Sequence, residues 1–228
     1  MIHTEVTALV RGAGSGQRLG LGPKAFLELE GRTLVEWAVE PMLAVAARVL
    51  AAVPEADLDR ARSNLEPMGV EVMVGGASRL ETTRKLLAAA DTTWVIFHDA
   101  AHPFVTRELT ERVLQNAFEE GAAVSALRTR DFHYDADGGL VSRPGQLHLV
   151  QTPFIVRRAD ILEGFALLAA GDRRVGKEAS TLEMLAATGH SWRFVDGPAT
   201  NIKVTYPEDL ELARAIAASR VAAPRAQG

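Results

Sequence analysis

Residues 6–29 read VTALVRGAGSGQRLGLGPKAFLEL, and this stretch decides which fold we expect. Its first five residues form a short apolar run, which is typical of a buried strand. A glycine turn follows at Gly12, Gly14 and Gly16. Glycine lets backbone amides close on a phosphate chain because it has no Cβ and accepts left-handed backbone angles. Arg18 and Lys24 then add positive charge, so the segment indicates a nucleotide-binding loop more than a simple turn.

Beyond this segment, short apolar runs alternate with helical patterns. Strands are expected at residues 6–10, 49–53, 70–74, 94–98 and 122–127, and helices at residues 34–43, 57–65, 79–89 and 106–119. Right-handed crossovers place such helices on both faces, so we expect an α/β fold with a mainly parallel sheet. Ligands of open sheets bind beyond the carboxyl ends of the strands. The glycine turn, Gly75, Gly76 and Asp99 all fall at such ends.

Residues 129–148 interrupt the alternation. They are polar and rich in turn residues, and Asp137, Gly138 and Gly139 form a hairpin signal, so we expect a protruding β-arm. After the arm, helices are expected at residues 158–169, 178–188 and 207–218, and strands at residues 192–195 and 202–205. Together these elements indicate one domain over residues 1–218, followed by a disordered tail at residues 219–228.

Composition narrows the class of protein. The chain has 228 residues, of which 47% are hydrophobic and 24% charged, as is ordinary for a globular protein. Its formal net charge is -4, so a free nucleotide is a better expectation than a nucleic acid polymer. The chain has no cysteine, which excludes disulfides and thiolate metal sites. No signal peptide or membrane span is evident, so we expect a cytoplasmic protein.

The two familiar glycine fingerprints do not match the turn. The dinucleotide pattern G-x-G-x-x-G requires a third glycine, but that position is Gln17 when counted from Gly12 and Leu19 when counted from Gly14. The spacing of the Walker phosphate loop does not occur at all. The two cations favour nucleotide transfer over hydride transfer, because attack on phosphorus adds negative charge that positioned cations stabilise.

Asp99 follows an apolar strand in the segment HDAAHPF at residues 98–104. A carboxylate in this position can bind Mg²⁺ or a ribose hydroxyl, and a helix cap or turn is the alternative. A zinc site is disfavoured, because no third ligand accompanies His98 and His102. Asp99 is therefore the candidate metal ligand of the chain.

Lys203 lies between two apolar residues, Ile202 and Val204. On a strand its side chain would point away from both of them, because successive side chains alternate between the two faces. Two interpretations stay open at this point: an exposed strand lysine, or a cation that closes over an anionic substrate.

Four segments in order resemble the 2-C-methyl-D-erythritol 4-phosphate cytidylyltransferases of the non-mevalonate isoprenoid pathway. They are GAGSGQRLG with PKAFLEL, GGASRLETT, HDAAHPF, and QTP with NIKVTYPEDL, and the likeness extends over residues 6–218. The resemblance implies a Rossmann-like, three-layer α/β domain whose β-arm interlocks two subunits in a homodimer. It also implies that CTP and methylerythritol phosphate react to give the CDP-alcohol and pyrophosphate, by in-line attack on the α-phosphorus and with Mg²⁺ as cofactor.

The resemblance also implies residue roles. Arg18 and Lys24 would stabilise the transition state, Lys203 would hold the methylerythritol phosphate, and Arg143 of the arm would reach that substrate across the dimer. Asp99 would bind the metal. The residues that would contact the nucleotide are Gly12, Ala13, Gly14, Gly16, Gly75, Gly76, Thr82, Asp99 and Ala100.

Several positions depart from the family pattern, mostly in the part of the site for the second substrate. Arg11 and Gly12 stand where the family usually has Pro-Ala, and His102 stands where it usually has an arginine. The arm segment around Phe132 has no clean counterpart of the threonine usual there, and Gly176 stands where the family usually has another threonine. Two alternatives therefore remain: transfer to another polyol phosphate such as ribitol 5-phosphate, or a catalytically silent nucleotide-binding homologue.

Overall fold

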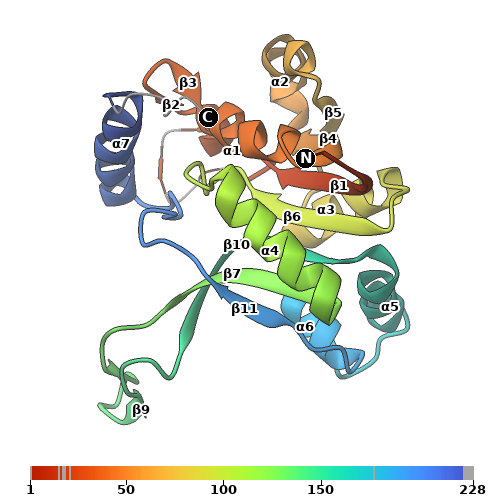
Figure 1. Cartoon of the computed structure of the whole chain (residues 1–228), viewed down its shortest axis with the longest axis vertical. Coiled ribbons are helices and arrows are strands. Elements are labelled where there is room, and N and C mark those ends of the chain that lie inside the picture. The colour runs from red at the N-terminus through yellow and green to blue at the C-terminus, as the bar shows by residue number, and fades with distance from the viewer. Residues whose placement is uncertain (1, 15, 17–18, 21, 177, 223–228) are drawn as a thin grey trace.

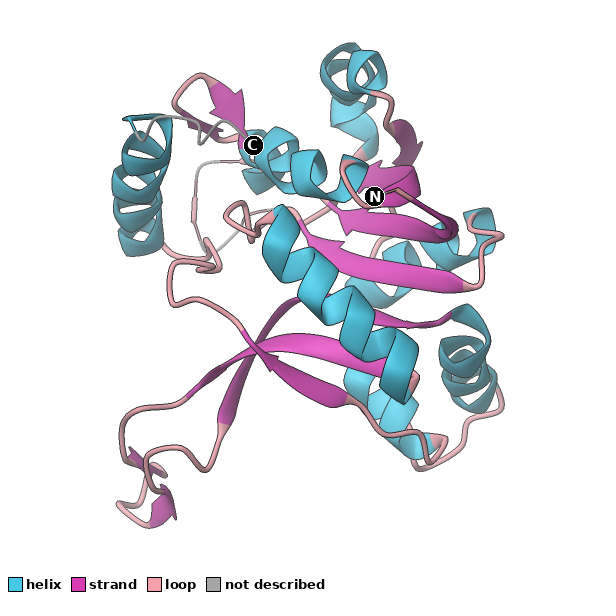
Figure 2. Cartoon of the chain, viewed as in Figure 1, coloured by secondary structure: helices cyan, strands magenta, loops and turns pink. Residues whose placement is uncertain are grey.

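The computed structural model describes residues 2–14, 16, 19–20, 22–176 and 178–222, and its centre is a seven-stranded sheet. The strand order is β11-β7-β10-β6-β1-β4-β5 (Figure 2). All pairs of neighbours are parallel except those made by β10, which runs antiparallel to both β6 and β7. The mainly parallel sheet predicted from the sequence is confirmed. The strands are β1 (His3–Arg11), β4 (Ala46–Val53), β5 (Glu71–Val74), β6 (Trp94–Asp99), β7 (Ala122–Arg128), β10 (His148–Arg157) and β11 (Arg193–Asp196).

Helices cover both faces of the sheet (Figure 1). Alternate residues of β1 point to opposite faces: Ala8 and Val10 belong to the apolar core on the side of α1, α2 and α4, and Leu9 belongs to the core on the side of α3, α5 and α6. Helix α7 packs outside the sheet against β2 and α1. The helices are α1 (Leu34–Leu43), α2 (Leu58–Leu65), α3 (Arg79–Ala89), α4 (Arg107–Glu120), α5 (Arg158–Ala169), α6 (Thr181–Ala187) and α7 (Pro207–Ala222).

Short elements complete the chain. A small hairpin of β2 (Glu28–Leu29) and β3 (Arg32–Thr33) leads into α1. At the start of α1, Thr33 Oγ1 accepts from Glu36 N at 3.3 Å, and Glu36 Oε2 accepts from Thr33 N at 2.7 Å. This reciprocal cap explains why the helix begins where it does. Single 3-10 turns lie at η1 (Lys24–Phe26), η2 (Glu55–Asp57) and η3 (Glu66–Met68). None of the described helices is both long and apolar enough to span a membrane.

Two expectations about the sheet differ from the structure. No strand was expected between the interruption at residues 129–148 and the helix at residues 158–169, yet β10 lies there, between β6 and β7 in the sheet. The polar residues Gln151 and Thr152 interrupt its apolar sequence, so the local pattern that predicts a strand is weak. The prediction of a strand at residues 202–205 is wrong, because this segment is a loop. Val204 N in this loop donates a backbone hydrogen bond to Ala101 O at 2.8 Å.

The last helix continues to Ala222 instead of ending at residue 218. The added residues include alanine and arginine, which have high helix propensity, so the helix continues beyond the residues where the apolar periodicity weakens. Residues 223–228, the remainder of the expected tail, lie outside the described residues.

Between β7 and β10 the chain leaves the sheet and forms an extension at the lower left of Figure 1. Its end is a hairpin of β8 (His133–Tyr134) and β9 (Leu140–Ser142). Asp135 holds the hairpin turn, because its Oδ1 accepts from the backbone N of Asp137 at 3.0 Å and of Gly139 at 2.7 Å. Many apolar side chains of this region are exposed: Phe132, Tyr134, Leu140, Val141, Leu147, Leu149 and Val150.

Candidate active site

A cavity of about 340 Å³ lies at the carboxyl ends of β1 and β6, where an open parallel sheet binds its ligands. The sequence-derived candidates that line it are Gly12, Ala13, Gly14, Lys24, Gly76, Thr82, Asp99, Ala100 and Lys203. They come from the glycine turn after β1, from η1, from the segment before α3 and from α3 itself, from the end of β6 and the residue after it, and from the loop before α7. Segments far apart in the sequence therefore meet at one site.

Close backbone contacts fix the described glycines of the turn after β1. Gly12 N donates to Ala52 O at 2.7 Å, which ties the start of the turn to β4. Gly16 has a φ of 66°, and a Cβ there would overlap the carbonyl oxygen of Gly22. Only glycine fits this position without strain. Arg18, which was predicted to act beside this turn, lies outside the described residues.

A second glycine segment forms another wall of the cavity. Gly75 N donates to Val53 O at 2.8 Å, and a Cβ on Gly75 would overlap that of Ala13. Thr82 secures this segment, because its Oγ1 accepts from Gly76 N at 2.9 Å and donates to Ser78 O at 2.9 Å. Thr82 lines the cavity, and its hydroxyl positions the glycine segment.

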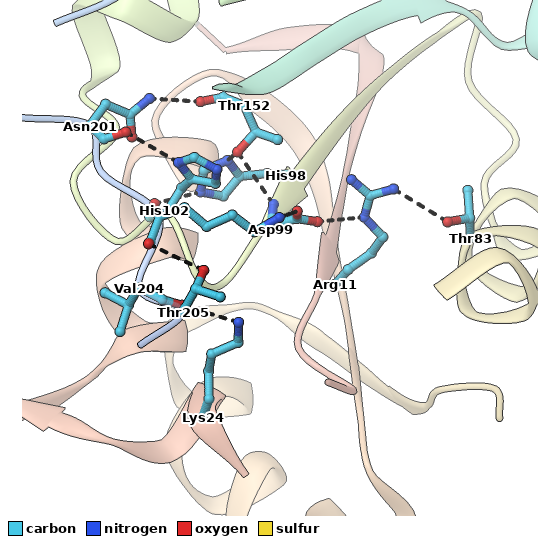
Figure 3. Close-up of polar contacts among 11 residues, drawn as sticks. Arg11, Lys24, Thr83, His98, Asp99, His102, Thr152, Asn201, Val204 and Thr205 are labelled. Carbon is cyan, nitrogen blue, oxygen red and sulfur yellow. Dashed lines mark hydrogen bonds and ion pairs between the residues drawn. The ribbon is translucent and has the colours of Figure 1, made fainter. Parts of the chain in front are cut away.

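Asp99 is the acidic side chain of the cavity, and Arg11 lies beside it (Figure 3). Arg11 Nε lies 2.7 Å from Asp99 Oδ1, and Lys203 Nζ lies 3.3 Å from Asp99 Oδ2. Burial alone would raise the pKa of this carboxyl, but the charge of Arg11 and then of Lys203 outweighs burial and holds the pKa below its ordinary value. Asp99 is therefore an anion at every physiological pH.

Arg11 was not among the site residues suggested by the sequence, although it lines the cavity. The available signal was its place at the end of β1, directly before the glycine turn. Because β1 pairs with β6, the last residue of one strand is the register partner of Asp99 on the other.

Two histidines lie behind Asp99 and are held by hydrogen bonds (Figure 3). His98 Nε2 is 3.1 Å from His102 O and its Nδ1 is 2.8 Å from Thr152 Oγ1, while His102 Nδ1 is 3.2 Å from Asn201 O. Since a carbonyl can only accept, each of these rings donates one N–H to the backbone. Burial lowers the pKa of His98 to about 3 and of His102 to about 4, so both are neutral at pH 7.

The two histidines serve the structure around the cavity. They are buried members of a hydrogen-bond network that connects β6 to the loop before α7. In the described part of the chain they form no group of three His, Cys, Asp or Glu side chains that could hold a metal ion.

The two lysines of the site come from different elements. Lys24 lies on η1, and its Nζ donates to Val204 O at 3.1 Å. Lys203 lies in the adjacent loop, where Val204 is buried and the lysine side chain is 45% exposed. The expected alternation of side chains holds locally even though this segment is not a strand. Of the two interpretations of Lys203, its contact with Asp99 favours a cation of the site.

Arg143 is separated from this cavity. It follows β9 in the extension, is exposed, and is not among the residues that line the cavity of its own chain. Its backbone N donates to Gln146 Oε1 at 2.6 Å. Phe132 is also exposed on the extension, and Gly176 has open space around the place of a Cβ.

Comparisons with known proteins identify relatives along nearly the whole chain. The family model of 2-C-methyl-D-erythritol 4-phosphate cytidylyltransferase matches residues 6–219. The enzyme of that name from Thermus thermophilus is 39% identical over 217 residues, which cover 93% of this chain and 97% of the relative. The enzyme of the same name from Deinococcus radiodurans is also 39% identical, over 215 residues that cover 92% and 88% of the two chains.

Solved structures agree with this assignment. The crystal structure of the Thermus thermophilus enzyme superposes with a TM-score of 0.77 at 35% identity and covers 96% of this chain and 100% of the other. The Anaerococcus prevotii structure of 4-diphosphocytidyl-2C-methyl-D-erythritol synthase has a TM-score of 0.81 at 22% identity, covers 93% and 96%, and supports the fold. The chain belongs to the 2-C-methyl-D-erythritol 4-phosphate cytidylyltransferase family.

Proposed function

We propose that this protein transfers the cytidylyl group of CTP to 2-C-methyl-D-erythritol 4-phosphate, a step of isoprenoid precursor synthesis. The observation that carries the proposal is the convergence of Lys24, Asp99 and Lys203 on a glycine-walled cavity in a member of this family. A phosphate oxygen of the substrate attacks the α-phosphorus of CTP and forms a new P–O bond. The bond from that phosphorus to the oxygen that bridges to the β-phosphate breaks, and pyrophosphate leaves with the electron pair.

In the proposed reaction the glycine turn cradles the triphosphate. Gly12 anchors the start of the turn through its bond to Ala52 O, the backbone amides of Ala13, Gly14 and Gly16 face phosphate oxygens, and Lys24, with Arg18 beside it, neutralises charge that develops on the α-phosphate. The second glycine segment, Gly75 and Gly76, borders the cytosine. These roles are supported by the shared cavity that Gly12, Ala13, Gly14, Gly76 and Lys24 line, with Lys24 next to Gly14.

Lys203 is proposed to hold the phosphate of the methylerythritol substrate. An ammonium group is a compact charge that suits a phosphate dianion. The exposure of this side chain at the cavity edge supports the role, since a second substrate can reach it. Asp99 and Ala100 would lie beside the ribose of CTP.

We also propose Mg²⁺ as the cofactor, with Asp99 as its protein ligand. A carboxylate oxygen suits this hard cation, and Mg²⁺ sites often combine one or two carboxylates with substrate phosphates. Asp99 is the only acidic side chain among the described residues that line the cavity, so its donor set fits an ion that is shared with the nucleotide. Bound there, Mg²⁺ would neutralise phosphate charge.

Residues 129–148 are proposed to act as the dimer arm. Exposed apolar groups of the extension and of the adjoining start of β10, such as Tyr134 and Leu149, would be buried against a second copy of the chain. In that dimer Arg143 would contact the methylerythritol phosphate of the partner's site. We place the reaction in the cytoplasm, where a chain without cysteine loses no disulfide to the reducing conditions.

The direct test is pyrophosphate release from CTP by the purified protein with 2-C-methyl-D-erythritol 4-phosphate and Mg²⁺. We expect one pyrophosphate for each CDP-alcohol formed, and no release at any substrate concentration would reject the proposal. Adding ribitol 5-phosphate as a competitor compares the two alcohols by their kcat/KM values. Binding of CTP without turnover on either alcohol would instead favour the silent homologue.

A further inference from the structure

Arg11 is held on three sides at the inner end of the cavity. Its Nε donates to Asp99 Oδ1 at 2.7 Å, its Nη1 donates to Thr83 Oγ1 at 3.4 Å, and its guanidinium carbon lies 5.7 Å from the centre of the Phe97 ring. The side chain is only 10% exposed. Figure 3 shows it extending from β1 toward Asp99 on one side and Thr83 on the other. This arginine is therefore a cation with a fixed position.

Asp99 has both carboxylate oxygens engaged, one with Arg11 and one with Lys203. With Lys24 and Arg79, four positive side chains and one negative side chain line the described wall, so positive charge is in excess. A lone divalent cation is repelled by such a set, whereas a triphosphate is attracted by it. The charge of the cavity therefore disfavours binding of a divalent cation alone and favours binding of the triphosphate, although the proposed reaction needs both.

We propose that Arg11 is a counter-ion that keeps Asp99 from binding a divalent cation until the nucleotide is present. The inference rests on the proposed nucleotide site. Phosphate oxygens that enter the cavity compete with Asp99 for Lys203 and Arg11, and every contact they take frees a carboxylate oxygen. The metal ion consequently binds as a complex with the nucleotide and not ahead of it.

A purely structural salt bridge would give a different result. If Arg11 served only to join β1 to β6, its replacement would lower the stability of the fold and leave the metal affinity of the nucleotide-free site unchanged. The affinity of the nucleotide-free protein for a divalent cation therefore distinguishes the two roles, and stability does not.

The test titrates Mn²⁺ into the full chain without nucleotide and follows the free-ion signal by electron paramagnetic resonance. Arg11→Met keeps the length and the apolar stem but removes the charge. We expect it to bind Mn²⁺ at least about tenfold more tightly than the wild type. The double variant Arg11→Met with Asp99→Asn should lose that gain. Without metal, in EDTA, Arg11→Met should bind CTP about tenfold more weakly, because a cation of the cavity is gone.

Two further variants serve as a charge control and as a replacement in case Arg11→Met does not fold. Arg11→Lys retains a positive charge and should bind Mn²⁺ as weakly as the wild type. Arg11→Gln is neutral and can still donate to Asp99, so it replaces Arg11→Met if that variant does not fold, as judged by circular dichroism. Equal Mn²⁺ affinity in the wild type and in a folded neutral variant overturns the inference. So does a gain in affinity that persists when Asp99 is replaced.

These measurements involve no cytidylyl transfer, so their failure differs from failure of the proposed function. Wild-type turnover combined with unchanged Mn²⁺ affinity rejects the role of Arg11 alone. A tenfold gain in Mn²⁺ affinity in a protein without turnover upholds the counter-ion and rejects the proposed reaction.

Discussion

The cavity and the extension at residues 129–148 are built in opposite ways. In the cavity the central ion pair is covered and lies within one chain: the side chain of Arg11 is 10% and that of Asp99 12% exposed. On the extension apolar side chains are uncovered, with Tyr134 62% and Val141 59% exposed. Polar groups are buried where a ligand is expected, and apolar groups are exposed where a second chain is expected. The difference supports the proposal that one chain prepares the nucleotide half of the site, while the other half needs a partner.

The largest expected effect concerns acid. An unfolded chain takes up a proton on each histidine as the pH falls below 6.5, whereas the folded chain keeps His102 neutral to about pH 4 and His98 to about pH 3. Stability that is fully present above pH 6.5 is thus lost as the pH falls. Each histidine contributes about 1.4 kcal/mol per pH unit, so the free energy of unfolding should drop by on the order of 5 kcal/mol by about pH 4.5.

Urea denaturation at a series of pH values, followed by circular dichroism, measures this dependence. The variant His98→Gln removes one of the two titrating rings and should halve the slope of the free energy of unfolding against pH. An unchanged slope in His98→Gln would show that acid destabilises the protein through groups other than His98.

The next effect concerns Lys24. Replacing Lys24 with alanine should lower turnover by roughly a hundredfold or more, because an oriented cation at a transition state contributes about 3 kcal/mol. The measurement is kcat/KM from pyrophosphate release, with Lys24→Arg as the variant that retains charge. A near-wild-type rate in Lys24→Ala would remove this residue from the chemistry and leave a cavity that only binds nucleotide.

A third prediction concerns the extension. Leu149→Asp places a charge in the proposed dimer contact, and losing the burial of one large apolar side chain should weaken the dimer by at least about tenfold. Leu212→Asp on α7 is the matched control, because Leu212 is an exposed leucine away from the extension. Sedimentation velocity over a concentration series provides the dissociation constants. Equal constants for both variants would separate the extension from dimer formation.

The smallest effects compare two similar backbone caps. Thr33 caps α1 in the body, and Asp135 holds the turn of the hairpin on the extension. Thr33→Ala should lower the free energy of unfolding by about 1 kcal/mol, a typical value for a lost helix cap. Asp135→Ala should change it by less than about 0.5 kcal/mol, since the turn is exposed and remote from the core. Thermal unfolding of both variants measures the difference, and a larger loss in Asp135→Ala would place the extension within the cooperative core.

Much of the fold could be predicted because its signals are local. Helices at residues 34–43, 79–89 and 158–169 were predicted with the bounds of α1, α3 and α5. Apolar spacing within a few turns sets such bounds, and side-chain caps from Thr33 and Ser78 add to it at the starts of α1 and α3. Strand β10 was missed since its place depends on β6 and β7, its neighbours in the sheet and not in the sequence. The same reason explains why the loop at residues 202–205 was taken for a strand.

Single residues of the candidate site could be predicted from the sequence, but the contacts between them could not. The glycine turn, Lys24 and Asp99 were each found from nearby residues. Arg11 was seen only as a departure from the family pattern, because its ion pair with Asp99 joins residues that are 88 positions apart. Nothing local to Arg11 reveals that partner. The parallel register of β1 and β6 brings the two together.

By itself, the sequence of this protein determined the alternation of strands and helices, the glycine turns and the family. These features depend on residues within a few positions of one another, whose spacing sets backbone angles and the apolar face of each element. Only the tertiary structure decided that the sheet contains an antiparallel strand and that Arg11 and Lys203 both pair with Asp99. Such contacts depend on strand order and register, which arise when distant segments bury their apolar faces against each other.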